Sequence, residues 1–430
     1  MGEVEIVKEK NIKLWNKNFF LLWQGQLVSV LGDVLYSIAL GFWVYERTKS
    51  TAIMGTLEAV TMLPRVILGP FAGVFVDKWD RKKIIVITDL IRGIFVTFVG
   101  IAAFMGFIQV WMVFVVGVIN GLCSAFFNPS VSSVKPDLVH KSKIIKANSV
   151  TSIAQSGMDM FGNAIGGALY VAIGASAMFL FNGISYIFSA CTEMFMKVPK
   201  ITRKNGESTF KEDFKEGFKF IWGFKTFKNI FIFACGINFL FIGGLTLLIP
   251  YFEDTPFLGA KRYGFAMTAM ALGMMMGSIL LSILNLNKNK KYKISIISII
   301  LCTFGFSTIA LIENYSIIIM IMFLSAFFNI IFNTIFNSVT MIIIPKNMRG
   351  KVNAIMGTLS AGLTPFGALI GGVLGEFIQL KVAIFALFFI CFIISIGLIF
   401  IKGIKKVLEF EGEGEDIDEL INSTNALYNK

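Results

Sequence analysis

The sequence predicts an all-α membrane protein in which twelve transmembrane helices form two six-helix halves and both termini are cytoplasmic. Three observations predict this class: an apolar composition, twelve apolar stretches of spanning length, and an uneven distribution of basic residues. Of the 430 residues, 56% are hydrophobic and 15% are charged, whereas a soluble domain has about 25% charged residues. The composition therefore excludes the soluble classes of protein and makes the lipid bilayer the first expected partner.

Each predicted helix is an apolar stretch long enough to cross a bilayer. A span needs about 20 mostly apolar residues, because the hydrocarbon core offers no hydrogen-bond partner to an exposed backbone. Twelve stretches meet this condition: 18–46, 51–76, 83–105, 108–128, 147–172, 175–197, 229–252, 262–286, 292–312, 315–344, 350–378 and 381–403.

The basic residues set the expected orientation. With both termini inside, 32 of the 39 Lys and Arg residues fall in cytoplasmic segments, five in outer loops and two in spans. Basic residues concentrate on the cytoplasmic side of membrane proteins, so we expect a multi-pass protein of a bacterial-type inner membrane. The net charge of +12 is then a consequence of topology, and we expect no nucleic-acid partner. The charged N-terminus also lacks the pattern of a removable signal peptide.

The chain divides into four expected regions. Residues 1–197 form an N-terminal six-helix bundle, 198–228 a cytoplasmic central loop, 229–406 a C-terminal six-helix bundle, and 407–430 an acidic cytoplasmic tail that we expect to be mobile. Within the central loop, apolar residues between Phe210 and Trp222 recur at helical spacing, and charged residues fill the opposite face. This pattern predicts an amphipathic helix that lies on the membrane surface.

A faint repeat relates the two halves. The run 161–167 (FGNAIGG) in the fifth span corresponds to 366–372 (FGALIGG) in the eleventh, and 124–128 corresponds to 325–329. A duplicated half is typical of secondary transporters, whose substrate site lies between the repeats. Small residues allow helices to approach closely, so we expect packing or hinge roles for the repeat glycines, which are Gly162, Gly166, Gly167, Gly367, Gly371 and Gly372.

The loop between the second and third spans carries a family signature. It runs from Gly73 to Lys83 as GVFVDKWDRKK, which resembles the G-x-x-x-D-R/K-x-x-R-K/R motif of the major facilitator superfamily. Gly32-Asp33, Leu63-Pro64 and Asn128-Pro129 further resemble the macrolide-efflux and enterobactin-exporter branch of the drug–proton antiporters. Two departures, Gly117 in place of an Arg and Asn163 in place of a Pro, argue against a proton relay through the fourth span.

The resemblance implies a cytoplasmic gate at this loop. Asp77 would meet a helix N-terminus or Arg81 and hold the inner side closed. The alternative is that the basic residues only anchor the loop on the cytoplasmic side. The gate residues that the signature implies are Gly73, Asp77, Lys78, Asp80, Arg81 and Lys82.

Ionisable residues inside a span are costly and are therefore functional candidates. All of them lie in the first half: Asp33, Glu58, Arg65, Asp89, Arg92, Asp159 and Glu193. Asp89 and Arg92, three residues apart, are expected to form a structural pair. Glu193 is expected to reach toward the membrane surface.

The mid-span acids are candidates for proton coupling. We expect Asp33 to lie near Arg65, a charge partner that would favour its ionised form, and Glu58 and Asp159 would then be better proton carriers. The alternative is that the mid-span charges only neutralise each other. The five cysteines lie far apart in apolar runs and are interpreted as packing residues, without metal or redox spacing.

Together these features favour a secondary transporter and disfavour an enzyme, because no Walker A loop, metal cluster or catalytic triad is present in the sequence. We expect a monomer without cofactor or metal that exports amphiphilic small molecules by alternating access, driven by protons, as in multidrug efflux and antibiotic resistance. A siderophore or lysophospholipid carrier is an alternative. A membrane receptor or scaffold that does not transport is a further one.

Overall fold

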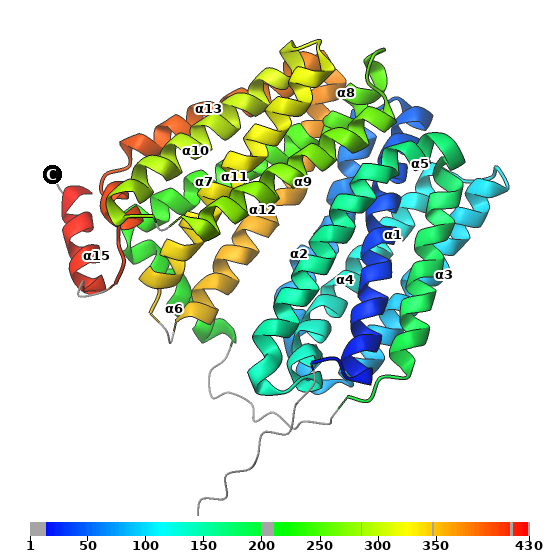
Figure 1. Cartoon of the computed structure of the whole chain (residues 1–430), viewed down its shortest axis with the longest axis horizontal. Helices are drawn as coiled ribbons and strands as arrows, with labels where there is room; N and C mark the ends of the chain where they lie inside the picture. The colour runs from blue at the N-terminus through cyan, green and yellow to red at the C-terminus, as the bar shows by residue number, and fades with distance from the viewer. Residues whose placement is uncertain (1–13, 199–209, 285, 346–347, 413–415, 429–430) are drawn as a thin grey trace, which may run out of the picture. The chain divides into compact units, whose positions relative to one another are not determined.

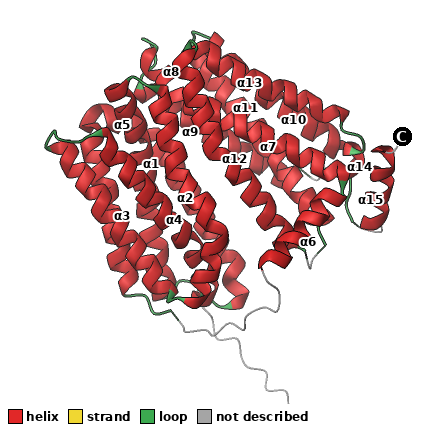
Figure 2. Ribbon diagram, turned by 180° about the vertical axis from the view of Figure 1, so that it is seen from behind, coloured by secondary structure: helices red, strands yellow, loops and turns green. Residues whose placement is uncertain are grey.

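The computed structural model describes residues 14–198, 210–284, 286–345, 348–412 and 416–428. In this part of the chain every regular element is helical (Figure 2). Eleven of the helices are long and apolar enough to cross a bilayer. The expectation of an all-α membrane fold is therefore confirmed at this level.

The helices of the first half begin and end close to the predicted spans. They are α1 (Lys17–Thr48), α2 (Thr51–Lys78), α3 (Arg81–Phe104), α4 (Val110–Leu138) and α5 (Ile144–Met194). The element α5 comprises two helices joined at a kink, which correspond to the fifth and the sixth predicted span. Its helical conformation is interrupted at Gly174, with φ 75° and ψ 171°, a left-handed region that glycine adopts without steric cost.

The second part of the chain contains shorter connecting helices as well as long ones. They are α6 (Phe210–Gly223), α7 (Lys225–Thr246), α8 (Leu248–Asp254), α9 (Ala260–Ile283), α10 (Lys288–Thr308), α11 (Tyr315–Ile343), α12 (Arg349–Phe377), α13 (Leu380–Gly397), α14 (Ile404–Leu408) and α15 (Ile417–Asn425). Short 3₁₀ turns lie at 141–143, 309–311, 398–400 and 426–428.

The contacts divide the chain into two compact units. Unit 1 comprises 1–36, 68–162 and 176–203, and unit 2 comprises 37–67, 163–175 and 204–430. The boundaries cut through α1, α2 and α5, so these units follow contacts and not chain order. The predicted division at 197 and 229 stays a prediction.

In unit 1, α3 packs along α4 (Figure 1). Glycines allow α3 to approach the second part of α5: a Cβ added at Gly100 would lie 2.8 Å from the backbone nitrogen of Leu180. An apolar cluster around Phe19, Leu22, Ile85 and Val134 closes one end of the unit. These contacts fix the relative rotation of the helices that carry the embedded charges.

In unit 2, α9 packs on α11, α12 on α7, and α10 on both α11 and α13 (Figure 1). The terminal part of α12 also contacts the start of α2. A Cβ added at Gly372 would lie 2.9 Å from the Cα of Gly55, and the carboxylate of Glu376 accepts a hydrogen bond from Ser50 Oγ at 2.8 Å. The segment 37–67 belongs to unit 2 because of these close contacts.

The central helix and the tail both pack on unit 2. Helix α6 contacts α12, where Lys351 Nζ lies 2.6 Å from Glu216 Oε2. The tail does not behave as a free segment: Leu420 of α15 is buried in the core cluster of unit 2, and Asn425 Nδ2 donates to Gly223 O at 2.8 Å. The expectation of a mobile tail was therefore wrong for these residues, because apolar side chains between the acidic ones supply a packing face.

Candidate functional site

Asp33 lies in the middle of α1, and its carboxylate accepts two hydrogen bonds from the second part of α5. The donors are the hydroxyl of Tyr186 and, at 3.3 Å, Nδ2 of Asn182. Both donors are buried, whereas Asp33 itself is accessible. The approach of α1 to α5 depends on Gly32, where an added Cβ would lie 2.6 Å from Ser185 Oγ. Asp33 is thus an accessible acid held by buried donors.

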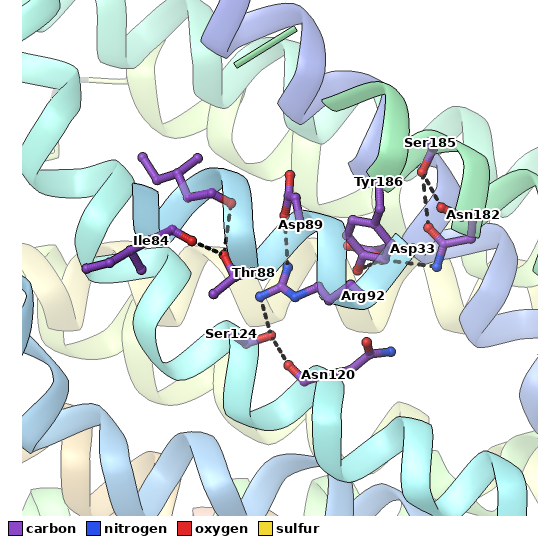
Figure 3. A network of polar contacts seen from close by, with 11 residues as sticks. Asp33, Ile84, Thr88, Asp89, Arg92, Asn120, Ser124, Asn182, Ser185 and Tyr186 are labelled. Carbon is purple, nitrogen blue, oxygen red and sulfur yellow. Dashed lines mark hydrogen bonds and ion pairs between the residues drawn. The ribbon is translucent and has the colours of Figure 1, made fainter. Parts of the chain in front are cut away.

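Arg92 of α3 lies on the other side of Tyr186. Its guanidinium carbon is 5.4 Å from the centre of the Tyr186 ring and 4.9 Å from that of Phe127. It donates to Ser124 Oγ of α4 at 3.1 Å, and lies 3.8 Å from Asp89 Oδ1. Figure 3 shows Tyr186 between Asp33 and Arg92. One aromatic side chain therefore connects the accessible acid to a buried ion pair.

The buried end of this network holds more acids than bases. Asp89 and Glu193 are 1% and 0% exposed, and in the described part of the chain neither carboxyl group has a hydrogen bond of normal geometry, although the Ser189 hydroxyl lies near both. Glu193 lies two helical turns beyond Tyr186 on the same face of α5, and the charges of Asp89 and Arg92 act on it. The expectation that Glu193 reaches the surface was wrong, because α5 turns this residue toward α3.

The predicted pair Asp89–Arg92 is present, since the two residues form an ion pair across one turn of α3. Whether this pair is only structural stays a prediction. Asp33 belongs to unit 1, whereas Arg65 of α2 is exposed and belongs to unit 2. The pairing of Asp33 with Arg65 also stays a prediction, and the hydrogen bonds of Asp33 go to α5.

Of the other two candidate proton carriers, Asp159 belongs to the same unit as this network and its charge acts on Asp33, whereas Glu58 belongs to unit 2. Glu58 of α2 is half-buried in unit 2, and its Oε2 accepts a 2.6 Å hydrogen bond from Thr246 Oγ1 of α7. Asp159 is exposed on α5. Glu58 is therefore placed to link α2 with α7, and Asp159 is placed where solvent reaches it.

The signature loop connects α2 to α3 and α4. Asp80 caps α3 by accepting a hydrogen bond from Lys83 N at 3.2 Å, and Arg81 forms a buried ion pair with Asp137 of α4 at 3.0 Å. Gly73 lies in α2 and Lys82 in the first turn of α3. The side chains of Asp77 and Lys78 lie outside the described residues, so the gate stays a prediction.

The repeat glycines lie where helices approach closely. Gly162 and Gly166 are buried in α5. An added Cβ would meet α1 at Gly162, 2.9 Å from Val34 Cγ1, and would meet a neighbouring helix at each of the other four positions after Gly166. These contacts are Gly167 with Ala260, Gly367 with Phe239, Gly371 with Gly243, and Gly372 with Gly55. The predicted close approach therefore occurs, whereas a hinge role stays a prediction.

Sequence reasoning missed Tyr186, Asn182 and Asp137. A helical spacing of polar residues was available in the sequence, because Asn182, Ser185, Tyr186, Ser189 and Glu193 recur every three or four residues and share one face of α5. The end of α4 carries one acid, Asp137, which was therefore available as a partner for the basic residues of the signature loop. No group of three or more potential metal ligands is found in the described ranges.

The fold defines a polytopic helical membrane protein that carries a network of charged residues within its spans. The family model of the Major Facilitator Superfamily matches residues 22–365. The chain therefore belongs to the major facilitator superfamily of transporters.

Individual relatives are similar over much of the chain. Macrolide efflux protein A of Streptococcus pyogenes is 27% identical over 278 residues, which cover 63% of this chain and 67% of the relative. The Staphyloferrin A transporter of Staphylococcus aureus (strain NCTC 8325 / PS 47) is 25% identical over 79% of this chain and 85% of its own. The crystal structure of the nucleoside transporter NupG matches with a TM-score of 0.71 and 11% identity, covering 92% of this chain and all of that chain. The structural match shows the fold alone.

Proposed function

We propose that this protein is a proton-coupled exporter of amphiphilic small molecules that works by alternating access. The observation that carries the proposal is the network from the accessible Asp33 through Tyr186 to Arg92 and Asp89. Ionisable groups within spans mark ion and proton pathways in transporters. Because family membership alone does not specify the driving ion, this network is the main support for protons.

Charge balance supports proton binding at this network. Asp33, Asp89 and Glu193 are three acids, and Arg92 is the one base that the described residues place among them. Removing a charge from water without a partner costs several kcal/mol per ion. The carboxyl groups in excess over Arg92 are therefore most stable in their protonated, neutral form. Asp33 is the member that solvent can reach, and we assign the exchange of protons to it. Glu58 and Asp159 remain the alternative carriers.

The efflux direction and the substrate class rest on relatives. Similarity to a macrolide efflux protein supports export of amphiphilic drugs. Similarity to a staphyloferrin A transporter supports the second candidate, a siderophore carrier.

We further propose twelve spans, with α5 counted as two because its helix is interrupted at Gly174. The proposed protein is a monomer of the inner membrane with cytoplasmic termini, and the proton gradient is its energy source.

The test uses the full-length protein in proteoliposomes with an imposed pH gradient. The probes are a radiolabelled macrolide and iron-loaded staphyloferrin A, each measured with and without an uncoupler. We expect gradient-dependent macrolide flux that the uncoupler abolishes and that Asp33→Asn reduces at least tenfold. Flux of staphyloferrin A alone would support the second candidate. If Asp33→Asn, Glu58→Gln and Asp159→Asn all keep gradient-driven flux, proton antiport is wrong, and no flux of any kind would support a receptor or scaffold.

A further inference from the structure

Unit 2 contains a cavity of about 690 Å³ among α7, α10, α11 and α12. Cavities of roughly 300–1,000 Å³ are the size that binds drug-sized molecules. All of the residues that line it belong to unit 2. The chemistry of its walls can therefore be analysed from one compact unit.

Five asparagines line this cavity, on three different helices. Asn329, Asn333 and Asn337 follow each other at intervals of four residues on α11, which places them on one face. Asn238 of α7 and Asn353 of α12 complete the set. None of the five is fully buried, so a molecule in the cavity can reach their amides.

Two of these amides are engaged with the protein. Asn333 Nδ2 donates to Asn329 Oδ1 at 2.9 Å, and Asn329 Nδ2 lies 3.6 Å from Cys302 Sγ. Asn238, Asn337 and Asn353 are accessible, and no described residue forms a hydrogen bond with their side chains. The first pair is therefore fixed in position, and the other three amides are available to a ligand.

The walls contain no acid or base among the described residues that line them. Their remaining polar groups are neutral, such as the hydroxyls of Thr303, Thr340 and Ser360. A phosphate or carboxylate ligand is normally met by Arg or Lys, which these walls lack. An amide offers both a donor and an acceptor, which matches hydroxyl, ether and carbonyl groups.

Aromatic side chains supply the apolar part of the same walls. Phe231, Phe241, Phe332 and Phe336 line the cavity beside the asparagines. A ligand that satisfies both kinds of wall has an apolar body and uncharged oxygen-bearing groups. Ligand sites of this composition, apolar with a few placed polar groups, are the usual ones for small molecules.

We infer that this cavity binds the uncharged, oxygen-rich part of the transported amphiphile, such as a glycosyl or polyhydroxylated group. The inference rests on the proposed transport function and specifies its substrate chemistry. It favours neutral glycosylated or polyether amphiphiles over anionic chelates and phosphate-bearing lipids.

The experiment compares three ligands that have the same alkyl chain and different head groups: octyl glucoside, octanoate and octyltrimethylammonium. Binding to the full-length protein in lipid nanodiscs is measured by titration calorimetry without a pH gradient, and empty nanodiscs correct for partition into lipid. We expect the glucoside to bind at least tenfold more tightly than either charged ligand. Equal or tighter binding of a charged ligand would overturn the inference.

Variants locate the binding in the cavity. Asn337→Leu and Asn353→Leu should each weaken glucoside binding about tenfold, whereas Asn289→Leu, at an exposed asparagine of α10 outside these walls, should leave it unchanged. If a leucine variant does not fold, Asn337→Asp is the alternative, and it should bind octyltrimethylammonium at least tenfold more tightly than the parent. Unchanged affinities in these variants would refute the cavity assignment.

These experiments distinguish a failure of the cavity inference from a failure of the proposed transport function. Because the binding measurement needs no gradient, glucoside binding without gradient-driven flux would refute only proton-coupled transport. Normal flux with unchanged binding in Asn337→Leu would refute only the inference about the cavity.

Discussion

At the scale of single residues, the side chain of Tyr186 makes contacts with two different residues. Its hydroxyl donates to the carboxylate of Asp33, while its ring faces the guanidinium of Arg92. Both contacts favour charged forms of their partners, since a donor stabilises a carboxylate and a ring face attracts a cation. The side chain of Tyr186 therefore lies in contact with both Asp33 and the Arg92–Asp89 pair.

Tyr186→Phe separates these two contacts, because it removes the hydroxyl and keeps the ring. A hydrogen bond to a charged group contributes about 1.5–3 kcal/mol, so we expect gradient-driven flux to fall at least tenfold while the protein still folds. The measurement is efflux against an imposed pH gradient, together with the thermal unfolding midpoint.

Tyr36→Phe is the matched control for this substitution. The Tyr36 hydroxyl is buried, and no partner for it exists in the described part of the chain, so its removal should leave flux unchanged and stability equal or higher. Equal loss of flux in both variants would show that Tyr186 acts through packing and not through its hydroxyl.

The candidate site could be predicted only in part from the sequence. The embedded acids were found because charge in an apolar stretch is unusual. Their partners were missed because the spans are apolar on most faces, and the rotation of each helix is then set by packing across helices. Thus Asp33 is bound to Tyr186 and Asn182 of α5, a contact between positions about 150 residues apart that no local pattern encodes.

At the scale of elements, most helices could be predicted from the length of the apolar stretches in the sequence. The stretch 83–105 was predicted and α3 extends from Arg81 to Phe104; likewise 315–344 corresponds to α11. The predicted turn near 173–174 is likewise present, since α5 consists of two helices joined at Gly174, where φ is 75° and ψ is 171°.

Helix α6 provides a test of both topology and surface binding. Its residue Ile221 is buried against unit 2, whereas Phe214 and Trp222 remain exposed. We expect a cysteine at Lys215 to react with an impermeant maleimide only from the cytoplasmic side, because the charged face of α6 cannot enter the bilayer.

This labelling needs a suitable background and a control. Cys191 is exposed, contrary to the expectation that all five cysteines are packing residues, so Cys191→Ser is introduced first. Lys381→Cys, which is exposed at the start of α13, should react only from outside. Labelling of Lys215→Cys from outside the cell would contradict the topology.

The tail helix α15 offers a stability prediction. Leu420 is 8% exposed within the core cluster of unit 2, and truncating a buried leucine costs about 2–5 kcal/mol. Leu420→Ala should therefore release α15 and make a C-terminal tag more sensitive to limited proteolysis. Glu419→Ala, one residue earlier on the exposed side, should not change the cleavage rate; equal sensitivity in both variants would mean that α15 is not held by this contact.

At the scale of the whole molecule, the proposed alternating access requires that some contacts within unit 2 break during each cycle. The contacts between the start of α2 and the end of α12 are the strongest candidates. Thr51 Oγ1 donates to Gly372 O at 2.7 Å, and Gly55 and Gly372 pack with their backbones in direct contact. Glu376 adds hydrogen bonds from Ser50 and Thr51. Small residues allow this approach, and the few polar bonds leave it reversible.

A disulfide between α2 and α12 should therefore stop transport reversibly. A Cβ added at Gly375 would lie 3.3 Å from the Cβ of Thr51, and disulfides have Cβ–Cβ separations of about 3.5–4.5 Å. The double variant Thr51→Cys/Gly375→Cys, in the Cys191→Ser background, should form the bridge on mild oxidation and lose gradient-driven flux at least tenfold. Reduction should restore the flux, which separates the effect of the bridge from that of the substitutions. Each single variant under the same oxidation is the control and should keep its flux. If the bridged protein transports at the rate of the reduced protein, these two helices do not separate during the cycle, and the gate lies at another pair of helices.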